Sequence, residues 1–358
     1  LILNYEILNA WLPFLRQWGP RTVIFDECQY MTNARTKRTL AGRQLAKICP
    51  HVLALSGTPI VNRPKELYPI LNMLRPDVFR SFHSFAHRYC KPSYKPWGWD
   101  YNGASNLGEL HQVLKDTCMV RRLKVEVLGE LPPKTRRVVA LKCKGMAEYR
   151  QADKDFMAWL KRTQGYGKAA AAAKAERMVK MGYMKRLAAK IKTPAVVNWC
   201  TDRMRREKLV MFAHHQDMVQ SLHNGTAQNT VVIDGQTQGR DRDLARLQFQ
   251  SHPKVRGLIG SQAAITALTL TAAATVAFAE LWWRPGDHSQ AEDRVHRIGQ
   301  DKPCEAIYLV AAGTIEEHIC EVLQAKQLVT GATLDGGEAA DLQIFDQLTE
   351  RLLRGTGA

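Results

Sequence analysis

Short runs of apolar residues recur along the chain, and most are followed by a polar or glycine-containing loop and then by a helical pattern. This alternation is typical of a parallel β-sheet with crossover helices. In the first block, Thr22–Phe25 and Val52–Leu55 have the composition of strands, and a basic helical segment, Thr36–Ile48, lies between them. The pattern predicts an α/β fold.

A second block of the same kind fills the C-terminal half. Its strand-length runs are Leu209–Phe212, Thr230–Ile233, Val255–Ile259, Thr275–Phe278 and Ala306–Val310. Helical patterns follow at Gln216–His223, Arg240–Phe249 and Ser289–Ile298, and a last long helix begins at Thr314 with Glu316 and Glu317 in its first turn. Acidic side chains at that position are favoured by the helix dipole. Two such blocks predict two α/β lobes with parallel sheets.

A region of different character, Arg80–Asn198, separates the two blocks and includes a helical run rich in lysine and alanine, Lys168–Lys192. We therefore predict four parts. Residues 1–79 form the C-terminal part of a first lobe, 80–200 form helical insertions and a basic connector, 201–313 form a second lobe, and 314–358 form a C-terminal helical segment. A chain of 358 residues is long enough for two cores.

One stretch, Ala263–Trp283, is long enough to span a membrane and contains no lysine, arginine or aspartate. It is rich in alanine and threonine, carries Glu280, and lacks the leucine and isoleucine density of a lipid-facing helix. We predict a buried loop, helix and strand there.

The formal net charge is +17, and the region from Lys115 to Lys208 holds 25 lysines and arginines against 9 acidic residues. Such a cationic zone attracts polyanions, since binding phosphates releases counterions. Charge alone leaves two interpretations open, a solvated basic face and a nucleic-acid-binding face. The eight cysteines are scattered without a CxxC pair, which argues against zinc and a disulfide framework and favours a reducing compartment.

Asp26 and Glu27 directly follow the first apolar strand, where ligands of α/β sheets collect. Nucleotide hydrolysis needs one carboxylate to hold Mg²⁺ and another to orient the attacking water, and we expect Asp26 and Glu27 in these roles. Many apolar strands end in Asp-Glu without such a function. Ser56, Gly57 and Thr58 end the next strand, and the hydroxyls of Ser56 and Thr58 are candidates to sense Glu27. Taken alone, these residues are better explained as a simple glycine-proline turn with a serine cap.

The string QAEDRVHRIGQ, from Gln290 to Gln300, is more specific. Arg294 and Arg297 are three residues apart, so on a helix both project from one face toward one anion. The planar, permanently charged guanidinium stabilises charge on a transferring phosphoryl group. A salt-bridged surface helix is the alternative.

Together these residues resemble the Swi/Snf-type ATPases of helicase superfamily two, and most nearly their annealing-helicase branch. The resemblance covers almost the entire chain and follows the family's order. The matching segments are LNYEIL at Leu3, DECQ at Asp26, LSGTPI at Leu55, RRLKVEVLGELPPK at Arg121, FAHH at Phe212, IDGQT at Ile233, FAELWWRP at Phe278 and QAEDRVHRIGQ at Gln290.

The resemblance implies two RecA-like lobes, ATP and Mg²⁺ as cofactors, DNA as the track, and Arg294 and Arg297 acting as fingers from the second lobe onto ATP. It also implies nucleotide contacts from Gln290 and Gln300. Residues that it assigns to DNA binding or coupling are Ser56, Gly57, Thr58, Arg121, Arg122, His214, Gly235, Thr237 and Thr269.

The chain departs from the family pattern at several places. The family's Gly-Leu-Asn-like element corresponds to Thr266–Thr269, the asparagine before Pro285 is replaced by Arg284, and Gln29 stands where many relatives have histidine. A phosphate-binding loop with Gly, Lys and Ser or Thr should precede the acid strand, and the nearest imitation, Gly165–Ala169, lacks the required hydroxyl. The sequence therefore predicts a first lobe that is incomplete at its N-terminal side, and weak ATP binding and little hydrolysis by this chain alone.

The leading hypothesis is an ATP-dependent double-stranded DNA translocase that acts on duplex or forked DNA as a monomer. An RNA helicase of the same superfamily and a catalytically inactive DNA-binding scaffold remain alternatives. Compact spacing and the lack of appended chromatin-reading modules favour a bacterial or phage source and the cytoplasm, or the nucleus if the source is eukaryotic. No membrane association is expected.

Overall fold

The computed structural model describes residues 1–60, 62–95, 98–163, 170–226, 229–265 and 268–336. By its internal contacts the chain divides into two units. Among the described residues, unit 1 comprises Leu1–Arg122 and residues 325–336, and unit 2 comprises Leu123–Gln324. The predicted connector, residues 80–200, is thus shared between the units, because its first part up to Arg122 packs with the N-terminal block.

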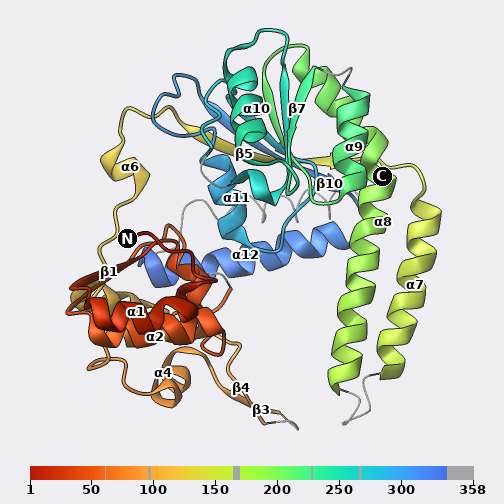
Figure 1. Ribbon diagram of the computed structural model, residues 1–358. Coiled ribbons are helices and arrows are strands. Elements are labelled where there is room, and N and C mark those ends of the chain that lie inside the picture. The colour runs from red at the N-terminus through yellow and green to blue at the C-terminus, as the bar shows by residue number, and fades with distance from the viewer. Residues whose placement is uncertain (61, 96–97, 164–169, 227–228, 266–267, 337–358) are drawn as a thin grey trace. The chain divides into compact units, whose positions relative to one another are not determined.

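The part of unit 1 up to Arg122 contains five helices and four strands among its described residues, coloured from red to orange in Figure 1. The elements are α1 Leu8–Trp18, β1 Thr22–Phe25, α2 Lys37–Ile48, β2 His51–Ala54, α3 Tyr68–Leu74, α4 Phe82–Tyr89, β3 Ser93–Lys95, β4 Gly98–Asp100 and α5 Leu107–Thr117. Short 3-10 turns cover Cys28–Met31 and Pro64–Glu66. Strands β1 and β2 pair in parallel, with Phe25 opposite Ala54, whereas β3 and β4 form an antiparallel hairpin.

Only one face of the β1–β2 pair is packed. Phe25 is buried against α1 and α2, in a core that also contains Leu12, Met31 and Leu45. On the opposite face Ile24 is 57% exposed and Leu53 is 50% exposed. Parallel sheets are usually covered on both faces, so this face is an apolar surface of unit 1.

Unit 2 is built on a six-stranded, fully parallel sheet of order β5-β10-β9-β6-β8-β7 (Figure 1). Its elements are α6 Lys124–Val127, β5 Lys134–Leu141, α7 Met146–Thr163, α8 Ala170–Met204, β6 Leu209–Phe212, α9 Gln216–Gly225, β7 Thr230–Ile233, α10 Gly239–Ser251, β8 Gly257–Gly260, β9 Thr275–Phe278, α11 Pro285–Glu292 and β10 Cys304–Ala311. Helix α12, Ile315–Leu334, begins in unit 2, and its residues from Ala325 belong to unit 1.

Helices cover both faces of this sheet. Side chains of α10, α11 and α12 pack on one face around Phe212, Phe278 and Tyr308. Side chains of α8 and α9 pack on the other face around Met211 and Leu309. All four residues of β6, β8 and β9 are buried, which explains why these strands are continuous apolar runs in the sequence.

The α/β prediction with parallel sheets is confirmed, and so are most of the predicted strands. Strands β1, β6, β7 and β9 have the predicted bounds, while β2 and β8 are shifted by one or two residues. All five strands predicted for the second block are present, and β5, which lies in the predicted connector, adds an unpredicted edge strand that pairs with β10. It begins with the charged residues Lys134, Arg136 and Arg137, and so it lacks the apolar run of a central strand.

The helix predicted at Ser289–Ile298 is also different. Helix α11 begins at Pro285, whose fixed φ suits a first helical position, and it ends at Glu292. The carbonyl of Arg294 accepts a hydrogen bond from the backbone N–H of Leu270 (2.8 Å) and therefore leaves the helical ladder. The two candidate arginines thus lie on consecutive turns beyond the helix.

The stretch Ala263–Trp283 is a folded part of unit 2 with the predicted strand, but among its described residues a 3-10 turn stands in place of the predicted helix. Its described residues include the end of the 3-10 turn Gln262–Ile265, a loop and the buried strand β9. Within the part of the chain that the structure describes, every helix is too short or too polar to cross a membrane.

Candidate functional site

Two acidic residues follow directly after β1, at the carboxyl end of the parallel pair. Oδ1 of Asp26 accepts a hydrogen bond from the backbone N–H of Glu27 (3.0 Å), and the Tyr5 hydroxyl donates to the Asp26 carbonyl (2.7 Å). Glu27 has left-handed backbone angles, φ 48° and ψ 51°. Such angles cost free energy for a non-glycine residue and cluster at functional sites. The turn holds both carboxylates at the end of the strand.

A chain of hydrogen bonds connects Glu27 to the loop after β2. The side-chain amide of Gln29 donates to Oε2 of Glu27 (2.6 Å), and the Ser56 hydroxyl donates to Oε1 of Gln29 (2.6 Å). The backbone N–H of Thr58 in turn donates to Oγ of Ser56 (3.1 Å). Ser56 therefore reaches Glu27 through Gln29. The residue that departs from the family's histidine is the link between the two motifs.

The same loop contacts the end of unit 1. The carbonyl of Gly57 accepts a hydrogen bond from Nη1 of Arg121 (3.3 Å), and Arg121 also forms an ion pair with Asp335. Arg122 is exposed, and its Nη1 donates to the carbonyl of Arg121 (3.0 Å). Of the two arginines predicted to contact DNA, Arg121 therefore already has a carboxylate partner.

In unit 2, both candidate arginines point at one carbonyl oxygen. Nη1 of Arg294 lies 3.4 Å from the carbonyl oxygen of Leu268, and Nη1 of Arg297 lies 3.2 Å from the same atom. Nε of Arg294 also donates to the carbonyl of Gln290 (3.2 Å). Although the segment is not helical, the two guanidinium groups converge as the sequence predicts for a helix. A guanidinium has five donors, and one donor of each group is directed at this oxygen.

The two glutamines of this motif have different surroundings. Gln300 is buried, and its Nε2 donates to the carbonyls of Ala273 (2.8 Å) and Val295 (3.2 Å). Its Oε1 accepts from the backbone N–H groups of Asp301 and Lys302. Both the nitrogen and the oxygen of the Gln300 amide are therefore bonded to backbone groups. A side chain that contacts a nucleotide would be expected to keep one of these atoms for the nucleotide. Gln290 is half-buried, and its backbone carbonyl accepts the hydrogen bond from Nε of Arg294.

A buried glutamate stands immediately before the arginines. Glu292 is 1% exposed and accepts hydrogen bonds from Arg136 (Nε to Oε1, 2.8 Å; Nη2 to Oε2, 2.8 Å), from Nζ of Lys134 (2.9 Å) and from the Tyr308 hydroxyl (2.6 Å). Burial alone would raise the pKa of Glu292, but Arg136 and Lys134 lower it to about 2. The charged carboxylate is therefore kept inside the protein by two cations on β5.

Residues 124–136, which we call the clamp segment, hold the arginine motif at further points. Nζ of Lys124 donates to the carbonyl of His296 (3.1 Å) and lies 2.7 Å from Oδ1 of Asp293. The carbonyl of Pro132 lies 2.8 Å from Nε2 of His296. The clamp segment and the arginine motif thus form one connected structure within unit 2.

The remaining candidates for DNA contacts in unit 2 lie after β6 and β7. His214 is exposed, and its backbone N–H donates to buried Glu280 (2.7 Å). Burial raises the pKa of Glu280, but hydrogen bonds from His215 outweigh it and lower that pKa to about 2. Gly235 is exposed, and the hydroxyl of Thr237 donates to Oδ1 of Asp234 (3.0 Å).

Strands β6 and β7 are parallel members of one sheet, so these two loops leave the sheet at the same edge. Thr269 is half-buried, whereas Thr266 and Ala267 lie outside the described residues, as does Gly165–Ala169. The altered Gly-Leu-Asn-like element is therefore described only in part.

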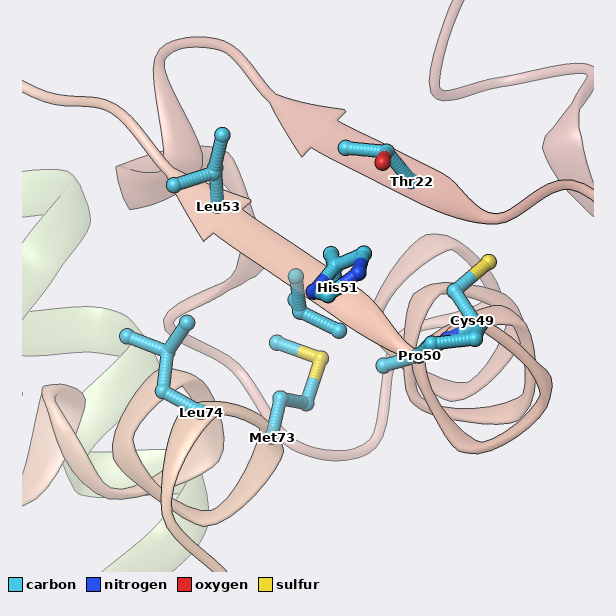
Figure 2. Close-up of a pocket in the computed structure, with 9 residues that line it drawn as sticks. Thr22, Cys49, Pro50, His51, Leu53, Met73 and Leu74 are labelled. Atoms are coloured by element: carbon cyan, nitrogen blue, oxygen red, sulfur yellow. The ribbon is translucent and has the colours of Figure 1, made fainter.

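A hollow of about 690 Å³ lies in unit 1 and is lined by Thr22, Ala46, Cys49, Pro50, His51, Val52, Leu53, Met73 and Leu74 (Figure 2). Thr22 and His51 are the first residues of β1 and β2, so the hollow lies at the amino ends of these strands. The acids are at the opposite ends. Ligands of α/β sheets bind at the carboxyl ends, and the hollow is therefore separate from the candidate site.

Three contributions to the site escaped the sequence reasoning. Glu292 is inside the quoted motif but was given no role, and its partners Lys134 and Arg136 lie far from it in the sequence. Tyr5, inside the LNYEIL segment, fixes the backbone at Asp26. The sequence does contain an indication of the role of Glu292. An acidic residue on the apolar side of a motif is expected to be buried, and a buried carboxylate must be paired with a cation.

Comparison with known protein families gives a direct result. The SNF2-related domain matches residues 1–191, and the helicase conserved C-terminal domain matches residues 191–299. The chain belongs to the SNF2-related family. The resemblance to Swi/Snf-type ATPases is thereby confirmed, and the SNF2-related match contains the acid motif while the helicase C-terminal match contains the arginines.

Curated SNF2-related proteins of animals are similar over most of the chain. The SWI/SNF-related matrix-associated actin-dependent regulator of chromatin subfamily A-like protein 1 of Xenopus laevis is 37% identical, with 87% of this chain and 32% of that protein covered. The human DNA annealing helicase and endonuclease ZRANB3 is 35% identical, with 94% of this chain and 32% of that protein covered. A solved structure, the Sulfolobus solfataricus SWI2/SNF2 ATPase core in complex with dsDNA, aligns over 97% of this chain and 75% of its own, with 23% identity and a TM-score of 0.43.

The chain spans about a third of the length of these curated relatives, 32% in both cases. Both come from animals, so the inference of a bacterial or phage source finds no support among them.

Proposed function

We propose that this chain is part of an ATP-dependent motor that moves along double-stranded DNA and remodels it. The observation that carries the proposal is the convergence of Arg294 and Arg297 on the carbonyl of Leu268. Two adjacent guanidinium groups suit the charge that develops on a transferring phosphoryl group. Membership of the SNF2-related family and the relative named as a DNA annealing helicase support DNA as the track.

The acids of unit 1 fit a magnesium ion. Asp26 is exposed, and its carboxylate oxygens are hard donors of the kind that Mg²⁺ prefers. In this proposal Asp26 holds the metal and Glu27 orients the attacking water, while Gln29 and Ser56 keep Glu27 in place. Bound Mg²⁺ would neutralise the phosphate oxygens of ATP.

Gln290 and Gln300 have separate roles in this proposal. Gln290 remains a candidate for a nucleotide contact because its side chain is only half-buried. Gln300 acts as a positioning residue, since its amide joins the backbone at Ala273 to the backbone at Val295, two residues before Arg297. Glu292 supports the same segment from the opposite side through Arg136.

Duplex or forked DNA is the proposed partner, bound without sequence preference. The basic surplus between residues 115 and 208 supports contacts to backbone phosphates. Ser56, Gly57, Thr58, Arg121, Arg122, His214, Gly235, Thr237 and Thr269 remain the proposed residues for DNA contact or coupling. The monomeric state and the four-part division stay predictions, and a nuclear location is proposed if the source is eukaryotic.

ATP hydrolysis by the full-length protein tests the proposal. Duplex DNA should stimulate hydrolysis, and Glu27→Gln should abolish turnover while ATP still binds. Arg294→Ala and Arg297→Ala should each lower the stimulated rate by about 10³-fold or more. Arg16, which is exposed on α1 and donates from Nη2 to Oε1 of Gln44 (2.8 Å), lies outside the basic region of residues 115–208 and provides the control variant Arg16→Ala.

The same assay separates the alternatives. Stimulation by RNA and not by DNA would identify an RNA helicase. DNA binding without any ATP hydrolysis would identify a scaffold. Either result, or full activity of Arg294→Ala, would overturn the proposed motor.

A further inference from the structure

The β3–β4 hairpin of unit 1 carries an exposed group of aromatic side chains. Tyr94 on β3 is 72% exposed and Trp99 on β4 is 52% exposed, and the two residues are paired across the hairpin. Tyr101 follows on the same side as Trp99. Figure 1 shows the hairpin extending past α4 at the edge of unit 1.

The rings hold one another in fixed orientations. Tyr94 meets Trp99 edge to face at 5.5 Å between ring centroids, and Trp99 stacks on Tyr101 at 6.4 Å with an angle of 21°. His87 on α4 contacts Trp99 at 5.2 Å and Tyr101 at 5.7 Å. An aromatic ring that is already ordered loses little conformational freedom when it binds a planar group.

The base of the hairpin is fastened to the body of unit 1. The Ser105 hydroxyl donates to the carbonyl of Arg88 (2.8 Å) and accepts from the backbone N–H of Lys91 (3.1 Å). A Cβ at Gly103 would lie 2.9 Å from Cβ of Lys91, so the two arms approach too closely for a side chain there. Tyr101 also packs against the buried core around Phe85 and Tyr89. The aromatic group therefore stands on a rigid support.

Cations gather at the base of the hairpin, where the one carboxylate of the hairpin strands, Asp100, accepts from the backbone N–H of Asn102 (3.1 Å). Arg63 and Lys65 both donate to the same oxygen, Oδ1 of Asn102, and the Lys65 bond is 2.6 Å long. A neutral amide oxygen does not cancel their charge, and both side chains have further donors. Lys91 and Lys95 lie along the first arm. Cations beside exposed aromatic rings match a strand that has phosphates and open bases.

We propose that this hairpin is a stacking platform for the unpaired bases of single-stranded DNA. Trp99 and Tyr94 stack on bases, while Arg63 and Lys65 bind the backbone phosphates. The inference deepens the proposed function and rests on it, since a motor on forked DNA meets unpaired strands at the branch. Paired bases in a duplex offer no free faces, so the platform distinguishes a single strand from a duplex.

Binding assays on the 358-residue chain test the platform directly. The ligands are a labelled oligothymidylate of about 16 nucleotides, an abasic strand of equal length and a duplex of equal length. The variants are Trp99→Ala, Trp99→Phe and the control Trp18→Ala, because Trp18 on α1 is 54% exposed and matches the 52% of Trp99. Fluorescence anisotropy at one fixed salt concentration gives each Kd.

Trp99→Ala should weaken oligothymidylate binding by about 5- to 150-fold and leave duplex and abasic binding unchanged. Trp99→Phe should restore most of the affinity, and Trp18→Ala should behave as the wild type. Equal oligothymidylate affinity of Trp99→Ala and the wild type would overturn the proposal and leave the hairpin as a surface for a protein partner. Equal losses on the abasic strand would overturn it too, since stacking needs a base.

The outcome is independent of the motor itself. If duplex DNA failed to stimulate ATP hydrolysis, the proposed motor function would be contradicted. The difference in oligothymidylate affinity between Trp99→Ala and Trp18→Ala would still support the platform. If Trp99→Ala had no effect on oligothymidylate binding while duplex DNA still stimulated hydrolysis, only the platform proposal would be contradicted.

Discussion

Arg136 and Glu292 are 156 residues apart in the chain and form a buried ion pair with two parallel hydrogen bonds. The pair joins the edge strand β5 to the segment that carries Arg294 and Arg297. A buried ion pair adds little net stability over an apolar contact, but losing one partner leaves a charge without compensation. The pair therefore specifies where the arginine motif lies.

Replacing Glu292 by glutamine should destabilise unit 2 strongly. The change keeps the size of the side chain but leaves Lys134 and Arg136 without their carboxylate, at a cost of about 3–5 kcal/mol. Urea unfolding measures this change. The control is Asp293→Asn, since the side chain of Asp293 is 33% exposed and its ion pairs should contribute about 1 kcal/mol or less. Equal stability of both variants would contradict the role of Glu292.

His288 should make stability depend on pH in the mildly acidic range. Burial lowers the pKa of His288 from its usual value of 6.5 to about 4. Its Nε2 accepts from the backbone N–H of Trp282 (3.2 Å), which requires the neutral ring. The unfolded chain takes up the proton first as pH falls, so the contribution is complete above about 6.5 and is lost between there and about 4.

The measurement is urea unfolding at several pH values within that window. The free energy of unfolding should fall by up to about 1.4 kcal/mol per pH unit. His288→Gln should give a flatter profile in the same window, at lower overall stability. A profile as steep as that of the wild type would assign the dependence to another group.

Gln29→Ala tests the link between the acid motif and the loop after β2. Removing the amide leaves Glu27 without its donor and Ser56 without its acceptor. The loss of one charge-assisted hydrogen bond corresponds to about 1.5 kcal/mol, or about tenfold in the DNA-stimulated rate of ATP hydrolysis by the full-length protein. Gln44, whose Oε1 accepts from Arg16 at the surface of unit 1, gives the control Gln44→Ala. An unchanged stimulated rate would show that the bridge is not part of the coupling.

Two glycines of unit 2 should respond in opposite directions to alanine. A Cβ at Gly260, at the end of β8, would lie 2.8 Å from Cβ of Ala264 and 2.9 Å from the ring of Phe212. Gly260→Ala should therefore cost about 1–3 kcal/mol. Gly239 begins α10 with open space around it, so Gly239→Ala should raise stability by up to about 1 kcal/mol. Thermal unfolding compares them, and a stabilised Gly260→Ala would contradict the packing at β8.

The sequence predicted the bounds of an element best where a single physical effect, such as burial on both faces of a sheet, determines them. Strands β6 and β9 are buried on both faces, so their apolar runs define their bounds. Strand β5 was missed because an edge strand with charged residues on one face resembles a connector. Helix α11 was misplaced because its end depends on a hydrogen bond from Leu270, which lies outside the segment.

The residues of the candidate site also fall into two groups, those that local sequence rules predict and those whose surroundings depend on distant partners. Asp26, Glu27, Arg294 and Arg297 follow from local rules about strand ends and the spacing of cations. The surroundings of Gln300 and Glu292 depend on partners distant in the sequence, such as Ala273 and Arg136. Local patterns do not specify such partners, and so sequence reasoning predicted a nucleotide contact for Gln300 and assigned no role to Glu292.

The clamp segment has a mechanical consequence. It follows unit 1 directly in the chain, and Lys124, Pro132, Lys134 and Arg136 fasten it to the arginine motif. Tension applied to the polypeptide near Leu123 would act on this motif before it acted on the central strands β6 and β9. The covalent connection would then work as a tether that transmits force to the two guanidinium groups.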